Sequence, residues 1–371
     1  MPPPQEKSQL FGLYVHIPFC LRRCFYCDFY SINDFELFWP YLEALKLEAS
    51  LYAPLFNEPF DSLYLGGGSP SLMTENDVPL LFEALAPLKL IKKAEVTIEA
   101  NPEDITPQKA AAWVKAGINR VSLGVQSFNP RHLSKSLGRF HKIEETFKAI
   151  SCLAEFKLAL SLDLLYAYGG QTINDWRREL EIAALSQADH LSCYVLTAYP
   201  GTSFYRSLKA GLITLADEEM TAELFMTAVE VLNGHNFECY EVSNFARNEA
   251  YCQHNLKYWC RIPYLGLGPS AHSFDGANRW ANLASLRRWG SALKRGSKPL
   301  RFKEKLTKDQ IYLEQLMLSF RLAEGCELSL VKSCQGLEDL ITSGKLKVEG
   351  SRLKPTYQGL LVADALARAL A

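Results

Sequence analysis

Three cysteines stand within eight residues near the amino end of the chain. Cys20, Cys24 and Cys27 follow a C-x3-C-x2-C spacing in the segment LYVHIPFCLRRCFYCDF. Thiolates are soft ligands that hold both iron–sulfur clusters and zinc. A structural zinc site takes four ligands, usually in two separated pairs, and no obvious fourth ligand follows here. The spacing therefore favours an iron–sulfur cluster over a three-cysteine zinc site or a loop of unrelated cysteines.

A [4Fe–4S] cubane held by three thiolates keeps one iron without a protein ligand. The amino and carboxylate groups of S-adenosylmethionine (SAM) can chelate that iron, and an electron passed into the sulfonium then cleaves a carbon–sulfur bond. The cysteine loop follows the strand-like run Leu13–Ile17, so we expect it at the C-terminal mouth of a parallel sheet or barrel. We expect Tyr26 to pack on the adenine and Tyr14 to reach the open iron.

A glycine run follows the next strand-like segment. Ser62–Leu65 leads directly into Gly66-Gly67-Gly68-Ser69-Pro70. Successive glycines let the backbone approach a ligand closely. A phosphate loop would continue with Gly-Lys-Ser/Thr, which this segment lacks, and a plain turn is the alternative. Because the run follows a cluster loop, we interpret Gly67, Gly68 and Ser69 as contacts for the amino-acid end of SAM.

Polar side chains also lie at the ends of later strand-like runs. Glu99 closes EVTIEA, Gln126 closes VSLGVQ, and Asp163 lies in LALSLDLLY. Carboxylates suit a sulfonium or ribose hydroxyls, and an amide suits the ribose or adenine edge. Arg139, in SLGRFH, is a candidate partner of the SAM carboxylate. Singly, each is more often a structural polar group, but their shared position at strand ends favours a SAM site.

Short β-rich runs and longer amphipathic stretches alternate from residue 11 onward. The runs expected to be strands are Leu13–Ile17, Ser62–Leu65, Glu95–Glu99, Arg120–Val125, Ala159–Leu164 and His190–Val195. The stretches expected to be helices are Trp39–Ala53, Asn76–Leu88, Pro107–Lys115, Ile143–Glu155 and Ile173–Ala184. This alternation predicts an α/β fold with a parallel sheet, and about six strands are too few for a complete eight-stranded barrel. We expect an open, partial (β/α)6 barrel.

The composition changes beyond about residue 300. A charged helix-like stretch, Lys308–Leu322, precedes short elements with a hairpin-like wing around Val348–Pro355. We expect a small helical, winged-helix-like domain at the C-terminal end. The resulting division is a barrel over 1–245, a connecting segment over 246–300 and the small domain over 301–371.

The composition narrows the class of protein. Lys and Arg number 40 against 41 Asp and Glu, which gives a net charge of -1 and disfavours a nucleic-acid-binding surface. The amino end lacks the apolar stretch of a signal peptide, and no window approaches the roughly 18 apolar residues of a membrane span. Ten cysteines without an export signal predict reduced thiols. We therefore expect a cytoplasmic protein with no membrane insertion.

Several segments together resemble a known family. YVHIPFCLRRCFYCDF, GGGSPS, EANPED, GVQSF and LGRFH are similar to the oxygen-independent coproporphyrinogen III oxidase family of radical SAM proteins. YEVSNFAR, HNLKYW and YLGLGPSAHS resemble the HemW branch of that family. The resemblance spans nearly the whole chain and implies a radical SAM barrel. It also implies SAM contacts at Tyr14, Gly67, Gly68, Ser69, Glu99, Gln126, Arg139 and Asp163.

Two features separate the branches. The oxidase has a further cysteine two residues after the cluster motif, where this chain has Phe29, and a longer extension before the barrel, where this chain has thirteen residues before Tyr14. Both features favour the HemW branch. That resemblance implies a haem chaperone, which binds haem and passes it to an acceptor apoprotein, expected to be a respiratory haem protein.

The segment HNLKYW resembles the H-N-x-x-Y-W haem-binding motif of that branch. Histidine and tyrosine are known axial ligands of haem iron, and Trp259 offers an apolar face. The residues alone favour a structural role for His254 and Tyr258, and only the resemblance reverses this reading. Cys252 and Cys260 are further candidate ligands. The alternatives are oxidative decarboxylation of coproporphyrinogen III and radical chemistry on haem itself.

One segment departs from the family pattern. The family commonly reads D-L-I-Y-G-L-P-G-Q-T, and this chain has D-L-L-Y-A-Y-G-G-Q-T over residues 163–172. The changes at Ala167 and Gly169 alter the backbone freedom of a loop that we expect to line the pocket. Asp163 is retained, so the prediction of a SAM site stands.

Overall fold

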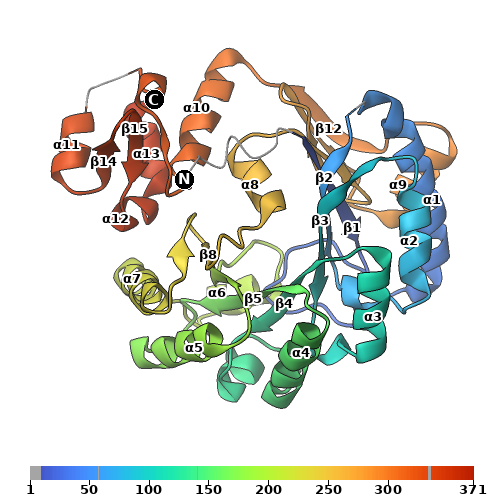
Figure 1. The fold of residues 1–371 in the computed structure, drawn as a ribbon, viewed down its shortest axis with the longest axis horizontal. Helices are drawn as coiled ribbons and strands as arrows, with labels where there is room; N and C mark the ends of the chain where they lie inside the picture. Colours follow the sequence, from blue (N-terminus) through green and yellow to red (C-terminus); the bar gives the residue numbers. More distant parts are fainter. Residues whose placement is uncertain (1–9, 57, 140, 333–335) are drawn as a thin grey trace.

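The computed structural model describes residues 10–56, 58–139, 141–332 and 336–371. Its centre is a 12-stranded sheet in the order β12-β11-β10-β9-β1-β2-β3-β4-β5-β6-β8-β7. Strands β1 to β6 are parallel neighbours in chain order. They curve into an open barrel with helices α1 to α5 on its outer face (Figure 1). The predicted partial α/β barrel is confirmed.

The elements of the barrel lie close to their predicted positions. The strands are β1 (Phe11–Ile17), β2 (Phe60–Gly67), β3 (Leu90–Ala100), β4 (Arg120–Gln126), β5 (Ala159–Tyr166) and β6 (His190–Val195). The helices are α1 (Phe38–Tyr52), α2 (Asp77–Leu85), α3 (Pro107–Ala116), α4 (Ile143–Glu155) and α5 (Ile173–Leu185). Strand β3 begins well before Glu95, where it was predicted to start. The prediction missed its first residues because the exposed Lys92 and Lys93 interrupt the apolar pattern.

Local signals set the ends of these helices. The Thr106 hydroxyl accepts the N–H of Lys109 ahead of α3, Pro107 is the first helical residue, and Gly117 ends the helix at a φ of 93°. Thr172 and Asp175 form a reciprocal capping box at the start of α5. Caps of this kind contribute about 1 kcal/mol each.

The barrel strands are buried on both faces. Every residue of β4 from Arg120 to Val125 is buried, as expected of a parallel strand that is covered on both sides. Trp113 of α3 and Trp176 of α5 are fully buried on the outer side. Truncating either tryptophan to alanine is expected to cost about 3–5 kcal/mol.

Further elements extend both edges of the sheet. At one edge, β9 (Tyr264–Leu267) pairs parallel with β1, and β10 (His272–Phe274), β11 (Asn278–Asn282) and β12 (Leu300–Lys305) continue antiparallel. At the other edge lie β8 (Asn244–Ala246) and β7 (Glu238–Cys239). The remaining helices of this part are α6 (Ser203–Lys209), α7 (Glu218–Gly234) and α9 (Leu286–Lys294). The domain boundaries near residues 245 and 300 stay predictions.

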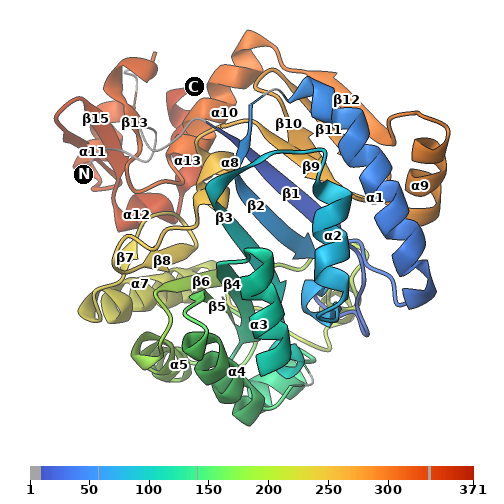
Figure 2. The ribbon, with the colours of Figure 1, turned by 45° about the vertical axis from the view of Figure 1, so that its right-hand side comes forward.

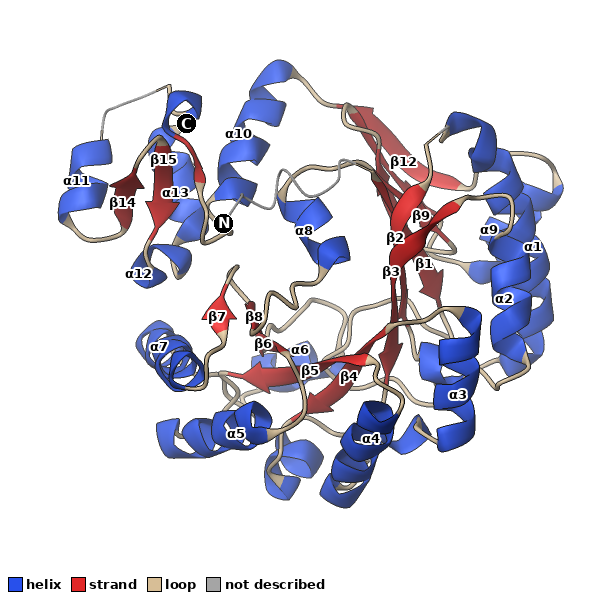
Figure 3. Ribbon diagram, in the orientation of Figure 1, coloured by secondary structure: helices blue, strands red, loops and turns tan. Residues whose placement is uncertain are grey.

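Helix α8 (Gln253–Trp259) lies on the inner side of the barrel (Figure 3). The Glu95 carboxylate, in the middle of β3, accepts the N–H groups of Gln253 and His254 at 3.0 Å each. Lys257 forms an ion pair of 2.6 Å with Asp61 of β2. Negative charge at a helix N-terminus is stabilising, so side chains of β2 and β3 hold this helix in place.

The C-terminal elements form a separate small layer beside the barrel (Figure 2). Strands β13 (Cys326–Glu327), β15 (Arg352–Pro355) and β14 (Leu346–Glu349) make a three-stranded sheet. The helices are α10 (Lys308–Ser319), α11 (Leu337–Thr342), α12 (Tyr357–Leu360) and α13 (Ala363–Leu370). Gly350 turns the β14–β15 hairpin at a φ of 60°, which confirms the predicted wing. Within the described ranges, no helix has both the length and the apolar character needed to cross a bilayer.

Candidate functional site

A cavity of about 850 Å³ opens at the carboxyl ends of the barrel strands. All three residues predicted to hold the cluster line this cavity, and so do eight of the nine predicted SAM contacts. Those residues are Cys20, Cys24, Cys27, Tyr26, Gly67, Gly68, Ser69, Glu99, Gln126, Arg139 and Asp163. Residues from five barrel strands and their following loops thus meet in one place.

The cysteine loop is fixed to neighbouring segments by hydrogen bonds. The Cys20 N–H donates to the Ile32 carbonyl at 2.9 Å, and the Cys20 thiol lies 3.4 Å from the Ser69 hydroxyl. The buried Arg139 donates from Nη1 to the Cys24 sulfur at 3.3 Å. A guanidinium this close stabilises a thiolate.

The donor set fits a [4Fe–4S] cluster. The three cysteines are free thiols, each partly exposed to the cavity. In the described part of the chain, no three His, Cys, Asp or Glu side chains converge on a single metal ion, and a cubane instead requires its thiolates on separate iron ions. Burial raises the pKa of Cys27 to about 11, so ligation has to displace that proton. When bound, a reduced cluster supplies the electron for cleavage of a SAM carbon–sulfur bond.

The glycine run brings bare backbone to the cavity wall. Gly67 has a φ of 107° and donates its N–H to Glu99 Oε2 at 3.0 Å. A Cβ on Gly67 would lie 2.4 Å from the His16 ring. The Gly68 N–H donates to the Ile17 carbonyl at 2.8 Å. Glycine is therefore required where β2 meets the cluster loop.

Two buried carboxyl groups face the cavity. Burial raises the pKa of Glu99 to about 7 and that of Asp163 to about 6. The Ser122 hydroxyl lies within hydrogen-bond reach of both Asp163 oxygens, at 3.0 and 2.9 Å. A cationic ligand would favour the ionised form of both groups, so the site suits a sulfonium or ammonium ion.

Gln126 and Arg139 also line the cavity. Gln126 has a φ of 67°, which is uncommon for a residue with a Cβ, and this conformation turns the chain at the end of β4. Arg139 Nη2 donates to Asn101 Oδ1 at 2.9 Å and to the Gly124 carbonyl at 3.1 Å. Its buried Nε has no hydrogen-bond partner among the described residues, so it can still bind an anionic group such as a carboxylate.

Tyr14 is the predicted SAM contact that does not line the cavity. Its hydroxyl lies 3.1 Å from His16 Nδ1, and its ring stacks on Tyr64 at 6.2 Å. The lining residues that the sequence reasoning missed include Tyr64, Asn101, Ser122 and Tyr194. No sequence signal marked the two tyrosines, because an aromatic residue in a strand is equally typical of a core and of a cavity wall.

The segment that departs from the family pattern packs away from the cavity. Asp163 and Leu165 line the cavity, whereas residues 167–170 do not, which corrects the expectation that this loop lines it. The Gly169 N–H donates to the Thr214 carbonyl at 3.0 Å, and a Cβ there would lie 2.4 Å from the Thr214 hydroxyl. A proline at this position would lose that bond. The absence of a side chain at Gly169 therefore allows its backbone to pack directly against Thr214.

The predicted haem residues form a second group on α8. His254 is fully buried, and its ring nitrogens lie 2.9 Å from the Ser62 hydroxyl and 2.8 Å from the Tyr258 hydroxyl. Burial lowers the pKa of His254 to about 3, so the ring is neutral. Trp259 is partly exposed beneath Arg321, 5.6 Å from its guanidinium. The Tyr64 ring, 5.3 Å from His254, separates this group from the cavity.

Comparisons with known proteins agree with this geometry. The family model of the Radical SAM superfamily matches residues 14–183. A protein of Mycobacterium tuberculosis named Heme chaperone HemW is 34% identical over 98% of this chain and 95% of its own length. The chain belongs to the HemW family of radical SAM proteins. A Bacillus subtilis protein of the same name is 30% identical over 95% of this chain and 96% of its own.

A solved structure supports the fold of this HemW-family chain. Coproporphyrinogen III oxidase (HemN) from Escherichia coli superposes with a TM-score of 0.84 over 99% of this chain and 92% of the other. Its sequence identity is 21%, so the likeness concerns the fold. Membership of the radical SAM superfamily implies a [4Fe–4S] cluster and SAM, and the cavity offers side chains suited to both.

Proposed function

We propose that this protein is a haem chaperone: it binds haem and transfers it to an acceptor apoprotein, and its [4Fe–4S] cluster and SAM accompany that task. The observation that carries the proposal is the near full-length similarity to two proteins named Heme chaperone HemW. Phe29 supports it, because an exposed phenylalanine lines the cavity where the oxidase would carry a further cysteine.

We propose His254, Tyr258 and Trp259 as the haem-contacting residues. A neutral imidazole is the form that binds iron, and burial keeps His254 neutral at all physiological pH values. The Tyr258 hydroxyl occupies Nε2, so haem ligation through that nitrogen has to separate the two side chains. The test therefore compares a variant that removes the proposed ligand with a variant that removes the hydroxyl bonded to it.

The test is an absorbance titration of anaerobically reconstituted protein with haem. We expect wild type to saturate near one haem per chain and His254→Ala to bind more weakly. Tyr258→Phe frees Nε2 without removing the ligand, so it is expected to bind haem at least as tightly as wild type. Gln253→Ala, on the same helix but outside the H-N-x-x-Y-W motif, is the matched control.

Two outcomes would count against parts of this proposal. Unaltered haem binding in His254→Ala would remove the proposed ligand. If neither wild type nor variant binds haem while iron analysis still finds a cluster, haem transfer is wrong.

The second candidate is the oxidative decarboxylation of coproporphyrinogen III. The fold shared with the Escherichia coli oxidase favours it, and Phe29 disfavours it. Anaerobic incubation with coproporphyrinogen, a reductant and SAM is the direct assay. No decarboxylated product from protein with an intact cluster is the expected result.

We further propose a respiratory haem protein as the acceptor and the cytoplasm as the compartment. The described cysteines, all free thiols, support a reducing environment. Haem transfer from loaded protein to a respiratory apoprotein, followed by the acceptor's own absorbance, tests the first point. Retention of all haem by the donor would contradict it.

A further inference from the structure

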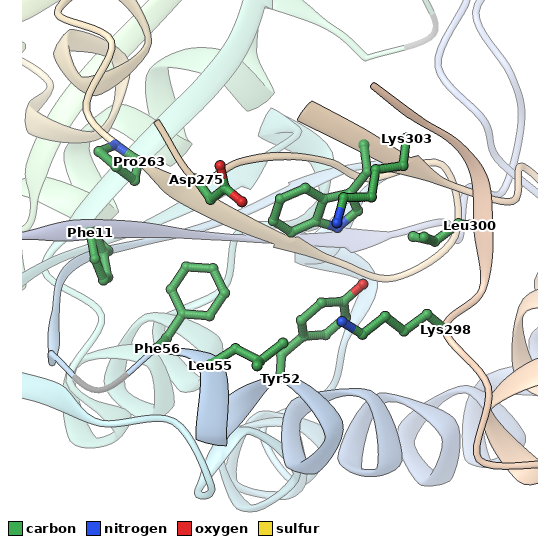
Figure 4. Close-up of a pocket in the computed structure, with 10 residues that line it drawn as sticks. Phe11, Tyr52, Leu55, Phe56, Pro263, Asp275, Lys298, Leu300 and Lys303 are labelled. Atoms are coloured by element: carbon green, nitrogen blue, oxygen red, sulfur yellow. The ribbon is translucent and has the colours of Figure 1, made fainter. Parts of the chain in front are cut away.

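A second cavity of about 440 Å³ lies at the start of β1, whereas the cluster loop follows the end of that strand (Figure 4). It is enclosed by the C-terminal end of α1, the first residue of β1 and the strands β11 and β12. It shares no lining residue with the cavity that holds the cluster cysteines. Its volume lies within the range of small-molecule sites.

One end of this cavity is apolar and aromatic. Phe11 and Phe56 meet edge to face with ring centroids 5.4 Å apart. Pro263 and Leu55 complete this end (Figure 4). Such a surface binds a flat or aliphatic body by excluding water.

The other end carries two lysines. Lys298 and Lys303 line the cavity, and their side chains enter it from the same side in Figure 4. Among the described residues, neither ammonium has a carboxylate within ion-pair distance, and Lys298 instead lies 5.2 Å above the Tyr52 ring. The one acidic lining residue, Asp275, accepts the N–H groups of Ala277 and Asn278 in its own turn and also interacts electrostatically with Lys303, so it offsets one of the two lysine charges. Positive charge is therefore left over at this end.

Two buried polar groups lie behind the lysines. Tyr52 and Trp280 stack on one another at 6.1 Å, and they are 1% and 7% exposed. In the described part of the chain, neither the Tyr52 hydroxyl nor the Trp280 indole N–H makes a hydrogen bond of full geometry. Burial raises the pKa of Tyr52, and the nearby Trp280 indole partly counters that rise. A buried donor without a partner is unfavourable by about 1–3 kcal/mol unless a ligand or water satisfies it. Both groups line the cavity, so an acceptor placed between the lysines would meet them.

We propose that this cavity is a binding site for a small amphipathic anion: an apolar, flat or aliphatic body that carries one carboxylate. The apolar body would lie against Phe11 and Phe56. The carboxylate would accept hydrogen bonds from Lys298, Lys303 and the Tyr52 hydroxyl. This site is independent of haem transfer and of SAM binding, because none of its residues contacts either proposed site.

The test is isothermal titration of the full-length protein with 2-naphthoate, beside the neutral analogue 2-naphthalenemethanol and inorganic phosphate. We expect naphthoate to bind one site per chain, and the neutral analogue to bind at least about tenfold more weakly, because charge-assisted hydrogen bonds are lost. Phosphate should not compete at the same concentration, since it lacks the apolar body. Equal competition by phosphate would overturn the amphipathic assignment.

Substitutions locate the site. Lys298→Met with Lys303→Met is expected to weaken naphthoate binding at least about tenfold. Lys294→Met, an exposed lysine of α9 outside the cavity, is the matched control. Arg23→Met, in the cluster cavity, should also leave the affinity unchanged. Unchanged affinity in the double variant, or loss in Arg23→Met, would overturn the proposal.

Tyr52→Phe keeps the test decisive if the double variant folds poorly. It removes one oxygen atom that makes no internal hydrogen bond of full geometry, so the protein should keep its thermal stability. Its affinity for naphthoate should fall several-fold. An affinity equal to wild type, together with no binding difference between naphthoate and its neutral analogue, would contradict the proposed site.

Discussion

The strand-end cavity and the buried group on α8 contain different polar residues, and they differ in whether those residues are paired with one another. In the cavity, Arg139 Nε lacks a partner, and the carboxyl groups of Glu99 and Asp163 have pKa values raised by burial. On α8, both ring nitrogens of His254 are bonded internally. One layer of side chains, including Tyr64, separates the two regions. A polar group without an internal hydrogen-bond partner is available to a ligand, whereas polar groups that bond to one another have to separate before a ligand can bind.

The largest effect is expected at the cluster cysteines. Cys20→Ser, Cys24→Ser or Cys27→Ser removes one of three thiolate ligands, so the reconstituted protein should lose nearly all cluster iron. Iron content and visible absorbance after anaerobic reconstitution measure this loss. Cys152→Ser on α4, outside the cavity, should keep full iron content. If all three variants keep their cluster iron, these cysteines are not the cluster ligands, and the cavity is not distinguished from α8 in this way.

The next effect concerns stability and should come from α8 alone. His254→Ala leaves the hydroxyls of Ser62 and Tyr258 without their buried partner, so the free energy of unfolding should fall by about 3 kcal/mol. Tyr258→Phe should lower it by about 1–2 kcal/mol. Denaturant titration measures both, with Gln253→Ala on the same helix as the control. SAM affinity should be unchanged in all three.

One outcome at α8 would show that the two regions form a single site. A His254→Ala variant that keeps wild-type stability but loses SAM affinity would show that this group belongs to the SAM site.

The affinity for SAM should depend on pH, and this dependence should come from the cavity and not from α8. Burial raises the pKa of Glu99 to about 7, so its carboxylate forms mainly between pH 6 and pH 8. If the carboxylate contacts a cationic part of SAM, affinity should rise about tenfold over that interval, following the ionised fraction. Glu99→Gln should remove most of the dependence and leave the smaller change expected of Asp163, whose pKa burial raises to about 6. Titrations of reconstituted protein with SAM at several pH values measure this change.

The unfolding of the ligand-free protein should show the reverse trend. The folded pKa of Glu99 lies above its ordinary value of 4.5, so the protonated form favours the folded state. This contribution to stability is fully present below pH 4.5 and is lost as the pH rises through about 7. If Glu99→Gln has the same pH profile of unfolding as wild type, burial of this carboxyl group is not the cause.

The difference between the regions also explains what the sequence could predict. Glu99, Gln126 and Asp163 interrupt apolar strands, and parallel strands bring their carboxyl ends to one edge, so periodicity alone was sufficient to group them. Tyr64 and Tyr194 were missed because an aromatic residue in a strand looks the same whether it packs in a core or lines a cavity.

The place of α8 depends on contacts that no local pattern contains. Its first N–H groups bind Glu95, which precedes His254 by 159 residues. The inner side of the barrel is defined only after six strands have assembled. A seven-residue helix carries too little amphipathic pattern to indicate which surface it covers. The residues alone favoured a structural role for His254, which agrees with its burial, but they could not predict that α8 lies inside the barrel.

The smallest effect is expected at Ala167, which lies beside the cavity without lining it. Ala167 has a φ of 67°, a conformation that strains a residue with a Cβ and that glycine adopts freely. Ala167→Gly should raise the free energy of unfolding by about 0.5 kcal/mol, because relief of strain exceeds the added entropy of the unfolded chain. Ala154→Gly, in helix α4, should instead lower it by about 1 kcal/mol. Denaturant titration measures both changes, and SAM affinity should stay at the wild-type value, since residues that only support the cavity wall affect folding and not the ligand. A weaker affinity in Ala167→Gly would extend the cavity region to this loop and restore it as part of the SAM site.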